Sequence, residues 1–147
     1  MIHRRSAKVL VLDDQDRVLL FRGRDPLAEG DVGWCFLPGG GIEGDETDEQ
    51  AAIRELREET GLRVSDVGPP IGTRRVTIPF GDDMLDSDEI YFLIKAPRFE
   101  PDSTGWTDVE RRTVVEHRWW AADALEATTE TIYPEDLLRW VRGGAVR

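Results

Sequence analysis

Residues 39–62 read GGGIEGDETDEQAAIRELREETGL and contain the best-defined element of this sequence. The opening glycines disfavour regular secondary structure, and a helix is expected to begin at Thr47. Thr47 and Gln50 have the spacing of a capping box, in which each side chain bonds the backbone of the other residue. Two acidic residues follow in the first turn, where the helix dipole favours negative charge. The helical pattern lasts until Gly61, which is typical of a left-handed cap.

Three carboxylates share one face of this predicted helix. At about 100° per residue, Glu55, Glu58 and Glu59 fall within a single arc. Ala51 and Ala52 lie on or beside that arc one turn earlier, so the acidic face has room for a ligand to approach. A different side of the helix, able to face a core, carries Ile53, Leu56 and Thr60.

The acidic arc has two interpretations. Like charges three or four residues apart repel by about a few tenths of a kcal/mol per pair, and Arg54, four residues before Glu58, can compensate part of this. An ordinary solvated face is one interpretation. The glycines at 39–41 favour the other, because a loop carbonyl beside carboxylates would complete an oxygen site for a hard divalent cation.

The spacing of residues 40–62 also matches a known signature. Gly40 is followed by five residues, Glu46, seven residues and the run Arg54-Glu55-Leu56-Arg57-Glu58-Glu59-Thr60-Gly61-Leu62. All nine fixed positions of the pattern are filled, so the segment resembles the Nudix box. The resemblance implies a single Nudix hydrolase domain over residues 1–147 with an α/β/α sandwich, in which helices flank a mixed β-sheet.

The same resemblance implies an activity. Nudix hydrolases cleave the diphosphate linkage of a nucleoside diphosphate derivative by water attack at phosphorus, using Mg²⁺ or Mn²⁺. Arg54 would orient the glutamates and Glu46 would brace the loop around the helix. The implied catalytic residues are Arg54, Glu55, Glu58 and Glu59. The implied metal ligands are the carboxylates of Glu55, Glu58 and Glu59 and the carbonyl of Gly39.

The residue that takes the proton from water stays open between two alternatives. Members of the family use either the glutamate that matches Glu55 or an acidic residue from a distant loop. For the second role the first candidate is Glu110, in the long loop expected at Pro97–Thr113, and the second is Glu116. For each of these two glutamates, a merely solvated side chain is the competing interpretation.

The rest of the chain is rich in predicted strands. Ala7–Leu12 and Arg17–Phe21 flank a four-residue polar turn and predict a hairpin. A second helix is expected to begin at Pro134, and Pro97–Thr113 is expected to be a long loop. A mixed sheet with two helices is therefore predicted. Its further strands are Trp34–Leu37, Leu62–Val67, Arg74–Ile78, Glu89–Lys95 and Val114–Trp120.

Composition excludes several classes of function. The net charge of −11 argues against binding of a nucleic-acid duplex, and the apolar runs are too short to cross a membrane. A single cysteine, Cys35, excludes a disulfide framework and fits a reducing, cytoplasmic location. The length of 147 residues is that of one domain. Family members often dimerise, so a homodimer is left open, although no feature of the chain requires one.

The substrate is less well defined than the chemistry. A small-molecule nucleoside diphosphate derivative is expected in a pocket between the sheet and the box helix. A catalytically silent, Nudix-like nucleotide-binding or sensor module is the alternative function. Phosphate contacts could come from Arg22, Arg24, Arg74 and Arg75, and base stacking from Trp34, Phe36 or Phe80.

Overall fold

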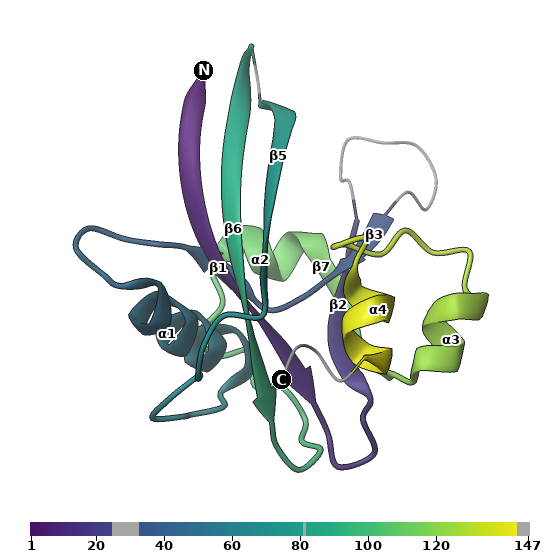
Figure 1. Cartoon of the computed structure of the whole chain (residues 1–147). Coiled ribbons are helices and arrows are strands. Elements are labelled where there is room, and N and C mark those ends of the chain that lie inside the picture. The colour runs from purple at the N-terminus through teal and green to yellow at the C-terminus, as the bar shows by residue number, and fades with distance from the viewer. Residues whose placement is uncertain (25–32, 81, 144–147) are drawn as a thin grey trace.

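A mixed β-sheet forms the centre of the protein. The computed structural model describes residues 1–24, 33–80 and 82–143. Figure 1 shows β1, β6 and β5 rising together beside the group of β2, β3 and β7, and this mixed sheet with its helices confirms the predicted fold class. The elements are β1 (Ile2–Leu12), β2 (Val18–Arg24), β3 (Gly33–Phe36), β4 (Gly39–Gly41), α1 (Asp48–Thr60), β5 (Gly72–Phe80), β6 (Asp83–Lys95), α2 (Asp108–Thr113), β7 (Val114–Trp120), α3 (Ala122–Ala127) and α4 (Leu137–Arg142).

Parallel pairing joins strands that are distant in the sequence. β1 and β6 pair in parallel from Ile2 with Leu85 to Leu12 with Lys95, and β5 adds to β6 in the antiparallel direction. On the other side of β1, β2 pairs with it antiparallel through Leu12 and Val18, which confirms the predicted hairpin. β3 and β7 both pair with β2, and β4 pairs with β1. The sheet therefore branches at β1 and β2.

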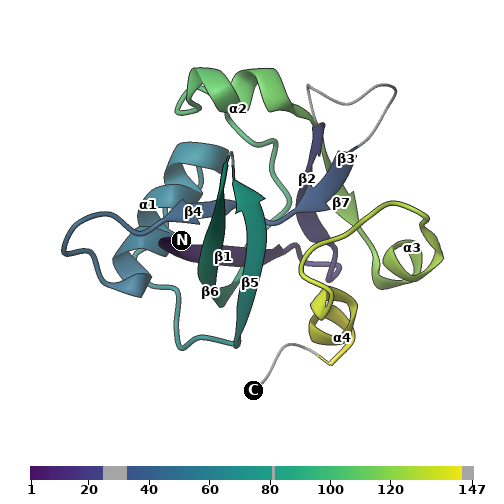
Figure 2. The same cartoon turned by 90° about the horizontal axis from the view of Figure 1, so that it is seen from above.

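Helices cover both faces of the β1–β6 layer. α1 packs on a cluster that includes Leu56 and Trp119. α3 and α4 pack on a second cluster that includes Leu10, Trp120 and Trp140. Seen from above, α1 and α4 lie on opposite sides of β5 and β6 (Figure 2). The adjacent tryptophans of β7 enter different cores, because successive side chains of a strand point to opposite faces.

Both ends of α1 are as the sequence predicts. The Oγ1 atom of Thr47 accepts a hydrogen bond of 3.1 Å from the backbone N–H of Gln50. In return the Gln50 side chain accepts one of 2.9 Å from the backbone N–H of Thr47, so the capping box is complete. Gly61 has a φ of 80° and ends the helix in the left-handed region.

Two segments differ from the prediction. The glycines at 39–41 were expected to lack regular structure, but they form β4, which pairs with Ser6–Lys8. Their missing side chains allow this pairing in a crowded place, since a Cβ on Gly39 would lie 2.3 Å from the carbonyl oxygen of Ala7. The strand predicted at Leu62–Val67 is wrong: these residues form no strand, and Val67 is buried in an irregular segment.

The described residues contain four helices instead of the two that were predicted. α2 lies within the expected long loop and carries its own capping box between Thr107 and Glu110. α3 follows Ala121, which gives no side-chain cap, so the sequence offers no start signal there. α4 begins at Leu137 instead of Pro134, because the intervening residues form a turn in which the Leu137 N–H bonds the Pro134 carbonyl.

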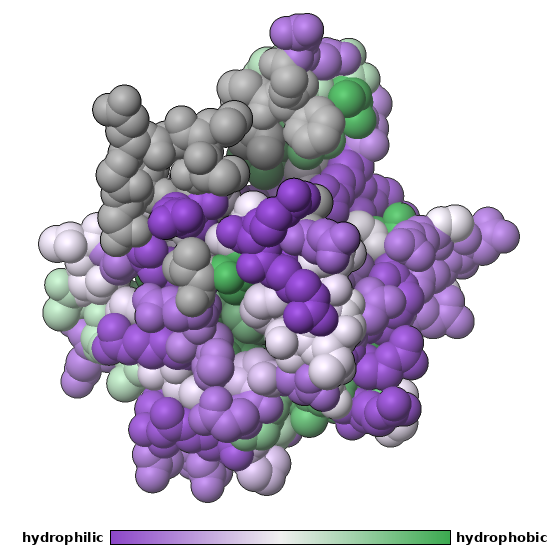
Figure 3. All heavy atoms as spheres, turned by 180° about the vertical axis from the view of Figure 1, so that it is seen from behind, coloured by the Kyte–Doolittle hydropathy of each residue, from purple (hydrophilic) through white to green (hydrophobic). Residues whose placement is uncertain are grey.

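The surface reflects the high content of charged residues. The face turned away from the viewer of Figure 1 is mainly hydrophilic, with hydrophobic residues in scattered areas (Figure 3). None of the helices in residues 1–24, 33–80 and 82–143 has the length and apolar composition needed to span a bilayer.

Candidate active site

The backbone of β4 lies directly against the acidic face of α1. A Cβ atom built on Gly40 would lie 2.6 Å from the carboxyl carbon of Glu55, so a larger residue there would have to displace this carboxylate. Gly39 has a φ of 142°, and its N–H donates a hydrogen bond of 2.9 Å to Oε2 of Glu59. Main-chain atoms of β4 therefore contact two of the three glutamates that the sequence singled out.

Arg54 is the centre of a network of carboxylates. Its Nε and Nη2 atoms donate hydrogen bonds of 2.6 and 2.8 Å to the two oxygens of Glu46, and Nη2 also bonds the carbonyl of Gly41 at 2.9 Å. Its Nη1 atom donates to Glu55 at 2.9 Å and to Glu58 at 3.1 Å. One guanidinium thus ties the loop before α1 to two glutamates on the helix, which is the fork geometry that arginine provides.

The three glutamates differ in their environments. The side chain of Glu58 is 41% exposed, that of Glu55 is 13% exposed, and Glu59 is buried. Burial raises the pKa of Glu55 despite the neighbouring guanidinium. Burial also raises the pKa of Glu59 well above its ordinary value, against the lowering effect of the Gly39 N–H, and the neighbouring carboxyl group of Glu110 raises this pKa further. Two of the three carboxyl groups therefore bind protons more readily than an exposed glutamate does.

The segment before α2 brings Glu110 to the box glutamates. The indole N–H of Trp106 donates a hydrogen bond of 2.7 Å to the carbonyl of Glu59. A Cβ on Gly105 would lie 2.5 Å from the carbonyl oxygen of Glu58, so this segment lies tightly against the last turns of α1. The carboxyl group of Glu110 acts on that of Glu59, whose pKa it raises.

Glu116 lies elsewhere. It is exposed on β7, where it pairs with Arg22 of β2. Its charge acts on the thiol of Cys35, whose pKa is raised to about 11, chiefly by burial. Of the two acidic residues that the sequence offered as bases, the structure therefore brings only Glu110 to the glutamates of α1.

The donor chemistry of this region suits a hard divalent cation. Carboxylate and carbonyl oxygens are the ligands that such ions prefer, and the bare backbone at Gly40 keeps main-chain atoms against the Glu55 carboxylate. In the described part of the chain, no three acidic, histidine or cysteine side chains meet closely enough to surround an ion. The Nη1 atom of Arg54 bonds both Glu55 and Glu58 instead. A cation and the guanidinium would therefore compete for the same carboxylate oxygens.

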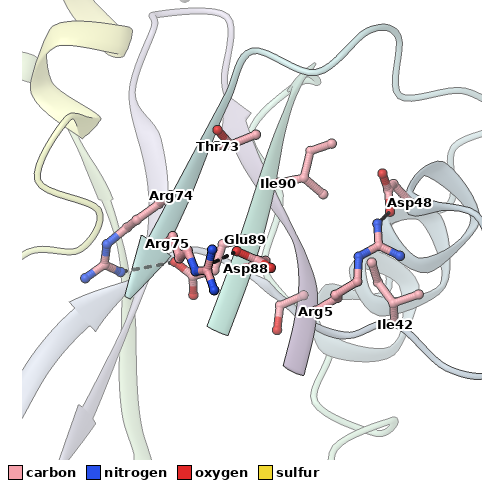
Figure 4. A pocket seen from close by; sticks show the side chains of 10 residues that line it. Arg5, Ile42, Asp48, Thr73, Arg74, Arg75, Asp88, Glu89 and Ile90 are labelled. Atoms are coloured by element: carbon pink, nitrogen blue, oxygen red, sulfur yellow. Dashed lines mark hydrogen bonds and ion pairs between the residues drawn. The ribbon is translucent and has the colours of Figure 1, made fainter. Parts of the chain in front are cut away.

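Two cavities lie against the β1–β6–β5 layer, and Ser6, Arg74 and Glu89 contribute to the lining of both. The larger, of about 730 Å³, is lined by four residues that the sequence suggested for substrate contacts, Arg24, Trp34, Phe36 and Arg74. The smaller, of about 310 Å³, lies on the α1 face and includes Arg5, Asp48 and Arg75. In Figure 4 the Arg74 side chain points away from Arg5 and Asp48. The box glutamates line neither cavity, so the pocket expected between sheet and helix corresponds only to the smaller one.

Two further sequence candidates are described by the structure: Arg22 bonds Glu130 at 3.1 Å, and Arg75 lines the smaller cavity. The Phe80 side chain is outside the described part of the structure. The cavity also contains residues that the sequence did not single out, among them Lys8 and Glu89. A signal existed for Lys8, because it is the one charged residue in the apolar stretch Ala7–Leu12. Its ammonium group lowers the pKa of Glu59, so it links the cavity to the box.

Comparison with protein families gives a match over nearly the whole chain. The NUDIX domain matches residues 2–141. Among curated proteins, an RNA pyrophosphohydrolase of Halorhodospira halophila is 42% identical over 72 residues, which are 49% of this chain and 36% of that protein. One from Gluconacetobacter diazotrophicus is 40% identical over 62 residues, 40% of this chain and 37% of that protein. The chain thus matches little more than a third of the length of these curated relatives.

Solved structures share the fold. The MutT protein of Methanosarcina mazei Go1 superposes with a TM-score of 0.68 at 20% identity, covering 99% of this chain and 97% of that one. The NUDIX domain of Shewanella oneidensis NrtR, solved with ADP ribose, has a TM-score of 0.68 at 17% identity and covers 99% and 90% of the two chains. At these identities the likeness concerns the fold alone.

Proposed function

Because the chain belongs to the NUDIX family, we propose that it is a hydrolase that uses Mg²⁺ or Mn²⁺ to cleave the diphosphate linkage of a nucleoside diphosphate derivative. The observation that carries this proposal is the Arg54 network, which gathers Glu46, Glu55 and Glu58 around one guanidinium. An acidic helix that only faced solvent would not need its carboxylates tied to one another and to the preceding loop.

The carboxylates of Glu55, Glu58 and Glu59 would hold the ion together with the carbonyl of Gly39. When bound, a divalent cation neutralises charge on phosphate oxygens and lowers the pKa of a coordinated water. Arg54 positions Glu55 and Glu58, since its Nη1 atom bonds both. Lys8 adds positive charge between Glu59 and the larger cavity, where a phosphate chain would pass.

Proton transfer from the attacking water has two candidate acceptors. Glu110 is the stronger one, because its carboxyl group acts on Glu59 and it comes from a segment fixed to α1 by Trp106. Glu55 is the other, and burial raises its pKa toward the range in which a carboxylate is an effective base near neutral pH. In either case the base takes one proton from water as the oxygen bonds to phosphorus, and the bridging oxygen leaves with the other phosphate.

The test is a substrate panel with and without Mg²⁺. It includes sugar nucleotides, dinucleotides, ADP-ribose and deoxynucleoside triphosphates, and a 5′-triphosphorylated oligoribonucleotide because the curated relatives are RNA pyrophosphohydrolases. Products are identified by mass in ¹⁸O-labelled water, and one labelled oxygen is expected in one product phosphate.

Two variants allow the substrate panel to distinguish a hydrolase from a silent binding module. Glu58→Gln is expected to abolish turnover, whereas Glu49→Gln, in the exposed first turn of the same helix, is expected to retain it. If the parent protein turns over no compound, and Glu58→Gln binds nucleotides as the parent does, the hydrolase proposal is overturned in favour of a silent binding module.

A further inference from the structure

The lining of the larger cavity includes the carboxylate of Glu89, one oxygen of which already accepts hydrogen bonds within the protein. Glu89 lies on β6, and its Oε1 atom accepts hydrogen bonds from the Tyr91 hydroxyl at 2.6 Å and from Arg74 at 3.1 Å. Among the described residues no hydrogen bond reaches its Oε2 atom. The side chain is only 13% exposed, and it lines the cavity. The Glu89 carboxylate, which contributes to the lining of both cavities, therefore has one oxygen whose acceptor capacity is unused.

Aromatic side chains form part of the cavity wall. Trp34 is 37% exposed and pairs with Gly23, whose missing side chain leaves room for the rings of Trp34 and Phe36. Tyr133 is 38% exposed, and the guanidinium of Arg74 lies 5.0 Å from the centre of its ring. Flat surfaces of this kind suit the faces of a planar heterocycle.

The positive charge of Lys8 would orient a nucleotide bound in the larger cavity. On β1, Ser6 pairs with Glu89, and Lys8 is the next residue of that strand on the same face. Lys8 contributes to the electrostatic environment of Glu59 in the box. A nucleotide with its base at Glu89 would therefore extend its phosphates along Lys8 toward α1, which places the scissile linkage near the carboxylates.

We propose that the larger cavity is a base subsite selective for guanine, in which Glu89 accepts hydrogen bonds from N1–H and the 2-amino group. This inference rests on the proposed function, because it names the base of that substrate. Guanine is the common base that presents two adjacent donors to a carboxylate. In adenine and cytosine a ring-nitrogen acceptor lies beside the amino donor, and in uracil carbonyls flank the single N–H, so each brings an acceptor against the carboxylate.

The test is equilibrium binding of GMP, IMP, AMP and CMP by calorimetry without divalent cations. IMP lacks only the 2-amino group, and a hydrogen bond to a charged group is typically worth about a factor of ten or more in affinity. GMP is therefore expected to bind about tenfold more tightly than IMP and to exceed AMP and CMP by more. N1-methylated GMP, which lacks the N1–H donor, is expected to lose a similar factor.

Glu89→Gln is expected to remove most of the preference for GMP over IMP. Asp88→Asn is the matched control, because Asp88 is the adjacent residue of β6, is 59% exposed and faces Arg75 instead of the cavity. It removes the same charge and should leave the preference intact. If Glu89→Gln fails to fold, comparing the binding of GMP and its N1-methylated form to the parent protein still tests whether the N1–H donor is recognised.

Equal binding of GMP and AMP by the parent, or an unchanged preference in folded Glu89→Gln, would overturn this assignment. Guanine-selective binding without turnover of any panel compound would support the subsite and contradict the hydrolase. Turnover that does not depend on the base, together with equal binding of the four monophosphates, would support the hydrolase and contradict the guanine subsite.

Discussion

Two hydrogen bonds of 2.6 and 2.8 Å join the guanidinium of Arg54 to both oxygens of Glu46. The pair connects the loop before α1 to the middle of that helix, and the Glu46 carboxylate also accepts a bond from the backbone N–H of Glu43. Hydrogen bonding to Arg54 lowers the pKa of Glu46 to about 2 from its ordinary value of 4.5. The loop and the acidic face of the helix are therefore held in register by a charged carboxylate.

This contact predicts a specific loss of stability in acid. A lowered pKa in the folded state stabilises the protein above the unfolded value, and that contribution disappears as the pH falls from about 4.5 through about 2. Glu46→Gln should be less stable than the parent at pH 7 in urea unfolding, and the difference should shrink toward pH 2.5. Glu43→Gln, on an exposed carboxylate of the same loop, is the control. A difference that does not change with pH would refute the account.

Gly40 should be intolerant of even one methyl group. Its Cβ would lie 2.6 Å from the Glu55 carboxyl carbon, so Gly40→Ala must displace that side chain. Misplacing a catalytic group by about 1 Å can reduce turnover about a hundredfold, and a loss of that order in kcat is expected. Gly41→Ala is the control, since its Cβ would meet only the flexible end of Arg4 at 3.4 Å. Equal losses in the two variants would show that the effect is not specific to Glu55.

Millimolar Mg²⁺ or Mn²⁺ is expected to raise the melting temperature, because an ion that binds only the folded state stabilises it. In Glu58→Gln this rise should shrink and kcat should fall about a hundredfold or more. Without metal, this variant should melt close to the parent temperature, since relief of like-charge repulsion on the helix offsets the weakened contact with Arg54. Scanning fluorimetry and steady-state kinetics measure both quantities. A melting temperature that does not change across the metal titration would argue against a formed site.

The choice of general base can be tested by comparing Glu110→Gln with Glu116→Gln. Of these two residues only Glu110 acts on Glu59, so only its substitution should reduce kcat, by about a hundredfold or more, which is typical of a lost acid–base group. The acidic limb of its pH–rate profile, where a general base becomes protonated, should also change shape. Near-parent turnover of Glu110→Gln, together with a large loss in Glu55→Gln, would transfer the role to Glu55.

The box helix could be predicted in detail because its signals are local. Thr47, Gln50 and Gly61 define its ends within fifteen residues, and the i, i+3 and i, i+4 spacing of the glutamates fixes their common face. The contact of Arg54 with Glu58 follows from the same spacing. The burial of Glu59 could not be predicted in this way, since it depends on α2 and on β4, which lie outside the helix.

Features that depend on residues distant in the sequence were harder to predict. The strand expected at Leu62–Val67 has apolar residues, but none of the strands that the structure describes pairs with it. The pairing of Arg74 with Glu89 depends on the register of β5 and β6, which no local pattern reveals. For α2 a signal was present, because Thr107 and Glu110 have the same capping-box spacing as Thr47 and Gln50.

The parallel pairing of β1 with β6 also has a consequence for how the chain folds. His3 contacts Asp86 across 83 residues of sequence, so the first strand has no parallel partner until most of the polypeptide has been synthesised. Loop closure over such separations slows folding. The box helix can therefore form early from its own caps, while the surface that it packs against is completed only late in biosynthesis.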